Sequence, residues 1–230
     1  MSTGNRAICW LVLATLFSIV GVTETFAQRG RGFGFGPNRA QLATLKEVQA
    51  ALNLSEEQIK VGIAATGEFN REVSELFRMA AGDVEKVRAA MPSLHEKATK
   101  QINEKLDETQ RKRLTEIFIQ QNGVNSVFDP QVRSILNLTD EQMAALQIAR
   151  KTNREEGAKE TRAMPKGETR EERSARFEQL WKNAEDRILT VLTPQQKTSF
   201  ETLRGEELEV DMRPLFPPPP PKKNDRRFAS

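Results

Sequence analysis

The sequence predicts an all-α protein of about eight helices, arranged as two tandem helical units that each read short, long, long, short. The first observation behind this prediction is a repeated phrase: residues 48–58 (VQAALNLSEEQ) return as residues 132–142 (VRSILNLTDEQ), 84 positions later. A weaker echo links residues 106–110 with residues 192–196, 86 positions apart. The second observation is that apolar residues recur at spacings of three and four, while no segment has the alternation of a strand.

The N-terminal 27 residues are expected to be a secretion signal peptide. Arg6 supplies a basic start, residues 7–22 are apolar, and Thr25 to Ala27 has the small residues of a cleavage site. An uncleaved membrane anchor is the alternative. Because the only cysteine, Cys9, lies in this segment, the mature chain would have no disulfide and no thiol chemistry. We therefore expect a secreted protein, in the periplasm.

Two basic segments flank the helical units. Residues 28–40 are predicted to be a Gly/Arg-rich disordered linker with Arg29, Arg31 and Arg39, and residues 212–230 a disordered proline-rich tail with five basic residues and one acid. The net charge of +3 thus combines basic arms with a mildly acidic body. The arms suit an anionic membrane or cell-wall surface, or they serve only as solubilising tails.

The first unit, residues 41–126, begins with a short apolar stripe. A long helix is expected from Glu56 to Ala80, and a second from Val84 to Leu106, which Pro92 should kink or divide. A shorter helix follows from about Glu108.

The second unit, residues 127–211, repeats this order. Asp129 precedes a proline at a helix start, and a long helix begins at Asp140. Residues 177–191 form the returning apolar stripe, and Thr193 opens a last short helix.

The repeated phrase has a direct physical explanation as a helix start. A hydroxyl or carboxylate at the cap accepts from the backbone three residues on, and the glutamine at that position reaches back to the cap N–H. Removing such a cap costs about 1 kcal/mol. The leucines before the caps at Ser55 and Thr139 can pack on Ile59 and Met143 as hydrophobic staples. The four copies consist of Leu54, Ser55 and Gln58; Leu106, Asp107 and Gln110; Leu138, Thr139 and Gln142; and Leu192, Thr193 and Gln196.

The copies LSEEQ (54–58), LTDEQ (138–142), LTPQQ (192–196) and, more loosely, LDETQ (106–110) make the chain resemble the Spy/CpxP family of bacterial periplasmic proteins, whose mark is the LTxxQ motif. That resemblance implies an antiparallel helical cradle that binds unfolded proteins without ATP, or that serves envelope-stress or metal-stress signalling. Family members carry two copies, so four copies imply two units fused in one chain, a monomer that imitates the family dimer. A homodimer remains the alternative.

The function expected from this resemblance is non-catalytic, chaperone-like binding of unfolded or envelope proteins. The candidate client-contact residues are large and apolar: Phe69, Phe77, Met79, Met91 and Trp181. Each of them could instead belong to the core at helical spacing. The alternatives are a structural envelope component tethered by the basic arms, or a metal-stress-related sensor.

Enzyme, metal-site and cofactor functions are not predicted. The single histidine, His95, is followed by Glu96, but position 99 is threonine, so the zinc motif HExxH is incomplete and His95 is expected to be an ordinary surface residue. No nucleophile motif or phosphate-binding loop is present. The secretion signal and the acidic body disfavour nucleic acid as a partner.

Overall fold

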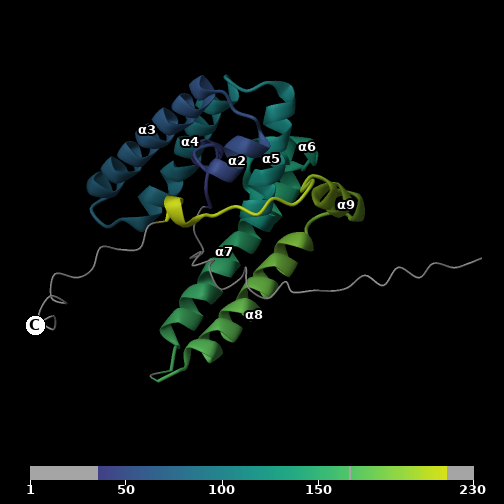
Figure 1. Ribbon diagram of the computed structural model, residues 1–230. Helices are drawn as coiled ribbons and strands as arrows, with labels where there is room; N and C mark the ends of the chain where they lie inside the picture. Colours follow the sequence, from purple (N-terminus) through teal and green to yellow (C-terminus); the bar gives the residue numbers. More distant parts are fainter. Residues whose placement is uncertain (1–35, 166, 217–230) are drawn as a thin grey trace, which may run out of the picture. The chain divides into compact units, whose positions relative to one another are not determined.

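The computed structural model describes residues 36–165 and 167–216, and this part of the chain is entirely helical apart from its connections. The all-α prediction is confirmed. The helices run in the order shown in Figure 1. They are α1 Arg39–Leu42, α2 Lys46–Ala51, α3 Glu56–Ala80, α4 Val84–Asn103, α5 Glu108–Asn122, η1 Gly123–Phe128, α6 Pro130–Ile135, α7 Asp140–Arg162, α8 Arg170–Leu189, α9 Pro194–Thr202 and η2 Arg213–Leu215. The predicted signal peptide, most of the predicted linker and the proline run after Phe216 lie outside the described residues.

Each repeat is built around a hairpin of two long helices, α3 with α4 and α7 with α8 (Figure 1). Pro92 does not divide α4, which is helical without interruption across it. Pro92 is exposed, so the Arg88 carbonyl that loses its intrahelical partner can bind water instead. The turn of the first hairpin is formed by Ala81 and Gly82, both with positive φ, before Asp83 caps α4.

The buried apolar residues of both repeats belong to one continuous core. Leu114 and Ile117 of α5 and Val132 of α6 are fully buried in this core. Leu146 of α7 and Ile188 of α8, from the second hairpin, belong to it as well. The two repeats therefore share their hydrophobic interior.

The interiors of the two hairpins differ. In the first, Phe69 of α3 is buried. The position 84 residues later is Asn153, whose buried Nδ2 donates to the carbonyl of Ala184 at 3.1 Å and whose Oδ1 accepts from Arg187. Arg187 also pairs with Glu156 at 2.8 and 2.9 Å. The corresponding positions of the two hairpins thus differ, with a buried aromatic ring in the first and a hydrogen-bonded amide in the second.

The predicted disordered linker of residues 28–40 is wrong at its C-terminal end. Asn38 caps α1 in a capping box with Gln41, and Asn38, Arg39 and Ala40 are buried. Asn122 of α5 donates from Nδ2 to the carbonyl of Pro37 at 3.2 Å. The folded part therefore begins before residue 41, the predicted start of the first unit, because residues 38–40 pack into the core.

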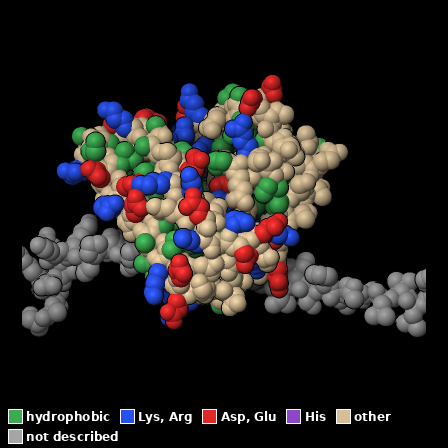
Figure 2. Space-filling view, turned by 90° about the horizontal axis from the view of Figure 1, so that it is seen from above, with side chains coloured by type: hydrophobic (Ala, Val, Ile, Leu, Met, Phe, Trp, Pro, Cys, Tyr) green, Lys and Arg blue, Asp and Glu red, His purple; other side chains and the backbone are tan. Residues whose placement is uncertain are grey.

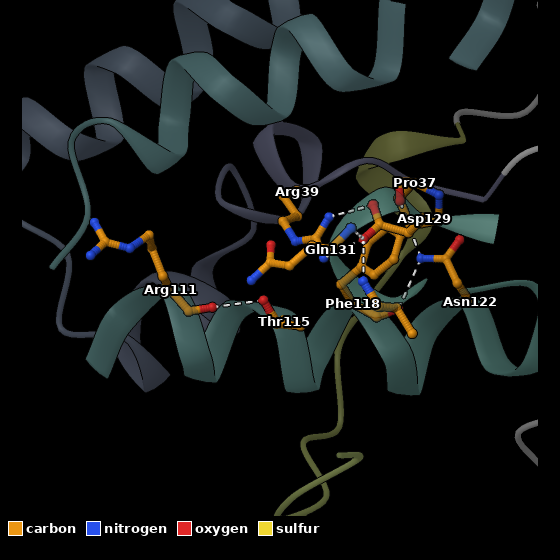
Figure 3. Close-up of polar contacts among 9 residues, drawn as sticks. Pro37, Arg39, Arg111, Thr115, Phe118, Asn122, Asp129 and Gln131 are labelled. Carbon is orange, nitrogen blue, oxygen red and sulfur yellow. Dashed lines mark hydrogen bonds and ion pairs between the residues drawn. The ribbon is translucent and has the colours of Figure 1, made fainter. Parts of the chain in front are cut away.

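Arg39 is an internal ion-pair partner and adds no charge to a basic arm. Its guanidinium, 1% exposed, donates to both carboxylate oxygens of Asp129 at 2.7 and 3.0 Å (Figure 3). It also stacks over the ring of Phe118 at 4.2 Å. The same Asp129 carboxylate caps α6 by accepting from the backbone N–H groups of Gln131 and Val132. One buried ion pair therefore ties the start of the first repeat to the start of the second.

The last short helix expected after Thr193 is α9, which ends at Thr202. After α9 comes the C-terminal strap, residues 204–216, which contains no α-helix, ends in the short 3-10 helix η2 and runs across α5 (Figure 1). Met212 and Leu215, both assigned to the disordered tail by the sequence, pack against the core. Among the described helices, none has the length and apolar content needed to cross a membrane.

We expect Arg39→Met to lower the free energy of unfolding by about 3–5 kcal/mol, because it leaves the Asp129 carboxylate without its buried partner. Urea unfolding followed by circular dichroism measures this change. The control is Arg78→Met, which removes the exposed Arg78–Glu75 pair and should cost less than about 1 kcal/mol. Equal costs for the two variants would show that the buried pair does not hold the repeats together.

Candidate functional site

The repeated phrase forms the base of each helical hairpin, and its first half ends a helix. Asn53 and Asn137 adopt the left-handed conformation, with φ of 48° and 50°. The N–H of the asparagine and of the following leucine bond back to the preceding helix, in the first repeat to Ala50 and Gln49 at 3.1 and 3.0 Å. This is a Schellman stop, and asparagine suits it because it tolerates positive φ better than most residues.

The second half of the phrase starts the next helix. In α3, Gln58 N–H donates to Ser55 Oγ at 3.3 Å, and Ser55 N–H donates to Gln58 Oε1 at 2.8 Å. The same reciprocal capping box is present at Asp107, Thr139 and Thr193. In all four motif copies, the helix thus begins with the same two hydrogen bonds between the cap residue and the glutamine three residues later.

The two motif glutamines of the first repeat also bond to each other. Gln58 Nε2 donates to Gln110 Oε1 at 2.7 Å, and Gln110 Nε2 is 3.3 Å from Gln58 Oε1. Each amide nitrogen has a second acceptor on the opposite connection: the Lys105 carbonyl for Gln58 at 2.9 Å, and the Leu52 carbonyl for Gln110 at 3.1 Å. We call this the first glutamine pair.

The second glutamine pair repeats this arrangement. Gln142 Nε2 donates to Gln196 Oε1 at 2.7 Å, and Gln196 Nε2 donates back to Gln142 Oε1 at 3.0 Å. The additional acceptors are the carbonyls of Val191, at 3.1 Å, and Leu136, at 3.2 Å. Every donor and acceptor in this pair sits 84 or 86 positions after its counterpart in the first. The shared geometry supports a tandem duplication.

Each glutamine therefore serves two helices at once, which capping alone does not predict. The Oε1 atom accepts from its own cap and from its partner amide, while Nε2 donates to that partner and to the facing connection. The pair closes the hairpin at the starts of α3 and α5, or of α7 and α9. A signal for this was available in the sequence, because the two motif copies within each unit have similar spacings of 52 and 54 residues.

The five candidate client-contact residues fall into different environments. Phe69 is buried, so its assignment as a contact residue is wrong. Met91 is partly buried against the core, and Trp181 is half-buried on α8. Phe77 and Met79 are exposed near the end of α3, and Val84 at the start of α4, which was not singled out in the sequence, is exposed as well.

His95 is half-buried inside the first hairpin and is not the surface residue that the sequence suggested. Its ring meets that of Phe69 edge to face, with centroids 5.0 Å apart. Burial lowers the pKa of His95 to about 4, Asp129 raises it, and Arg150 lowers it. Because burial has the largest effect, the neutral imidazole is the form that the fold accommodates.

Charged side chains also cross the first hairpin. Lys97 of α4 bonds to Glu68 and Glu72 of α3 at 2.7 and 2.6 Å. The bonds to these carboxylates raise the pKa of Lys97, and the bond from Lys97 lowers the pKa of Glu68. Within the described residues, no group of three or more histidine, cysteine or acidic side chains is arranged to hold a metal ion.

Comparisons of this chain with family models, curated proteins and solved structures find no match.

If the second glutamine pair acts as a unit, Gln142→Ala and Gln196→Ala should be non-additive. Each variant leaves its partner amide short of a bond, so the double variant should cost about 1 kcal/mol less than the sum of the single ones. Urea unfolding of the four proteins gives this coupling energy. Gln58→Ala combined with Gln196→Ala, which share no hydrogen bond, should add to within about 0.5 kcal/mol. The same additivity for Gln142 and Gln196 would contradict a paired role.

His95 should make the protein less stable as the pH falls. The unfolded chain binds a proton near the ordinary pKa of 6.5 and the fold binds one only near 4, so stability is lost between these values. From pH 7 to pH 5 the loss due to His95 should be about 2 kcal/mol. Urea unfolding of wild type and His95→Gln at both pH values tests this, since His95 is the only histidine. Parallel pH profiles for the two proteins would rule the effect out.

Proposed function

We propose that this protein binds other polypeptides without catalysis and without ATP, as a chaperone-like protein of the cell envelope. The observation that carries the proposal is a group of exposed apolar side chains at the end of the first hairpin. Phe77, Met79 and Val84 are 59%, 74% and 59% exposed, and they lie within eight residues of one another in the chain. We call these three residues the hairpin tip.

Exposed apolar side chains are costly to leave in water, and several of them at one end of a hairpin support a binding role. Methionine adds adaptability, because its unbranched thioether fits differently shaped partners. A partner without defined structure needs this kind of surface, which gains affinity from apolar burial without demanding one shape.

Charged residues surround the hairpin tip. Arg78 pairs with Glu75 and Lys86 with Asp83, all of them exposed. Figure 2 shows the same mixture over the face seen there, with small groups of hydrophobic side chains between basic and acidic ones. Exposed ion pairs contribute little to stability, so these charges remain available to a partner. A mixed surface of this kind supports reversible binding.

The hairpin tip is held away from the glutamine pair. Helix α3 has 25 residues, so it spans about 37 Å from Ser55 to the turn. The first glutamine pair anchors one end of the hairpin, and the exposed residues occupy the other. The hairpin can therefore hold its exposed apolar residues out toward a partner while its other end stays fixed. The envelope location rests on the predicted signal sequence, and the unfolded client on the family resemblance.

The experiment is aggregation of insulin after reduction by dithiothreitol, followed by light scattering. We expect equimolar wild-type protein to suppress aggregation, and Phe77→Ser combined with Met79→Ser to lose at least half of that suppression. Because both residues are exposed, the double variant should retain its helical circular dichroism and its unfolding midpoint.

The matched control is Ile148→Ser. Ile148 is 67% exposed on α7, so this variant removes a similar exposed side chain from outside the hairpin tip. It should suppress aggregation as wild type does. No suppression by wild type at equimolar concentration would refute the proposed function, and equal losses in both variants would refute the hairpin tip as its site.

A further inference from the structure

The first part of the C-terminal strap, residues 204–208, lies on α5 and is held there by its backbone. Gln120 of α5 is buried, and its Nε2 donates to the carbonyls of Arg204 and Glu206. Its Oε1 accepts from the backbone N–H of Leu208 at 3.0 Å. Arg113 also donates to the Glu206 carbonyl, at 2.7 Å. These four bonds do not depend on the side chains of the strap.

The residues that hold the strap form one face of α5. Arg113, Glu116 and Gln120 recur at spacings of three and four, and Arg113 pairs with Glu116 at 2.9 Å. Gly205 crosses this ion pair so closely that a Cβ would collide with the Glu116 carboxylate, and its φ is +59°. Glycine suits this position, because the positive φ strains other residues and a Cβ would displace the Glu116 carboxylate.

The strap alternates as a half-buried strand does. Leu208, Val210 and Met212 pack against the core, Glu207 and Glu209 are exposed, and Asp211 is partly buried. The three apolar residues are only partly buried, so the surface beneath them holds the strap without enclosing it. Recognition thus consists of backbone bonds at one end and an apolar side chain at every second residue.

We propose that this face of α5 is a binding groove for extended polypeptide segments with apolar residues at every second position, and that the strap is its resident occupant. A partner segment displaces the strap and takes over the bonds of Gln120 and Arg113. The inference rests on the proposed function in that the partner is a polypeptide. It adds a second contact site, with a preference for extended chain, to the hairpin tip.

Displacement controls the apparent affinity. A tethered segment competes at an effective concentration in the millimolar range, so a partner binds weakly while the strap is in place. The apparent dissociation constant equals the intrinsic constant divided by the fraction of open grooves. Weakening the strap should therefore strengthen partner binding, because the fraction of open grooves rises.

The test uses the full chain and a fluorescein-labelled peptide with the sequence of residues 204–216, followed by fluorescence anisotropy. The variant combines Leu208→Ser, Val210→Ser and Met212→Ser, which weakens the strap but leaves Gln120 and Arg113 intact. We expect it to bind the peptide at least tenfold more tightly than wild type. A variant with Glu207→Gln and Glu209→Gln, changed only at exposed positions, should bind as wild type does.

Two further peptides test what is recognised. One carries isoleucine at the positions of Leu208, Val210 and Met212 and should bind within about threefold of the original, because the backbone and the apolar alternation are retained. The other carries serine at these positions and should bind at least tenfold more weakly. Equal affinity of the strap variant and wild type for the original peptide, or no binding by either, would overturn the proposal.

Wild-type protein provides a measurement that does not depend on the variant folding. With the unlabelled peptide in millimolar excess, hydrogen exchange at the Leu208 amide of the chain itself should become at least threefold faster, because Gln120 then bonds to the peptide. Unchanged exchange overturns the proposal. Insulin aggregation separates the two sites: suppression without peptide binding refutes only the groove, and peptide binding without suppression refutes only the proposed function.

Discussion

The reciprocal amide bond between two motif glutamines is the interaction on which each repeat depends. Gln58 with Gln110, and Gln142 with Gln196, join two helix starts and two chain connections through one pair of side chains. A glutamine amide has both a donor and an acceptor, so two of them can pair and still satisfy a cap and a carbonyl. Glutamate or lysine at these positions would lack one of these capacities. This requirement accounts for the glutamine in all four motif copies.

The glutamine pair fixes only one end of each hairpin, so the residues along its two long helices can differ between the repeats. The first hairpin buries Phe69 at the position where the second has Asn153, which bonds to Arg187 between the helices. Divergence also extends to the junction of the repeats, where Arg39 and Asp129 form a single buried ion pair. The shared core consequently belongs to one folded body with two unlike hairpins, one of which carries the exposed apolar residues used in our proposal.

Local signals predicted the fold better than the site. The caps at Ser55, Asp107, Thr139 and Thr193 act within three residues, so their helix starts could be inferred from sequence. Three features could not be inferred from the sequence, because each depends on contacts with distant segments: the burial of Phe69, the ordering of Arg39 and the placement of Leu208. Arg39 is the clearest case: next to a glycine-rich stretch it resembled a tail residue, yet its partner Asp129 lies 90 positions away.

The sequence by itself determined the helical class, the duplication and the helix starts, because capping and helical periodicity are properties of neighbouring residues. Only the tertiary structure decided that the motif glutamines pair, that the repeats share one core, and that the chain after α9 lies across α5. These features need donors and acceptors from segments more than 50 residues apart, and the pattern along the chain does not specify which of them meet.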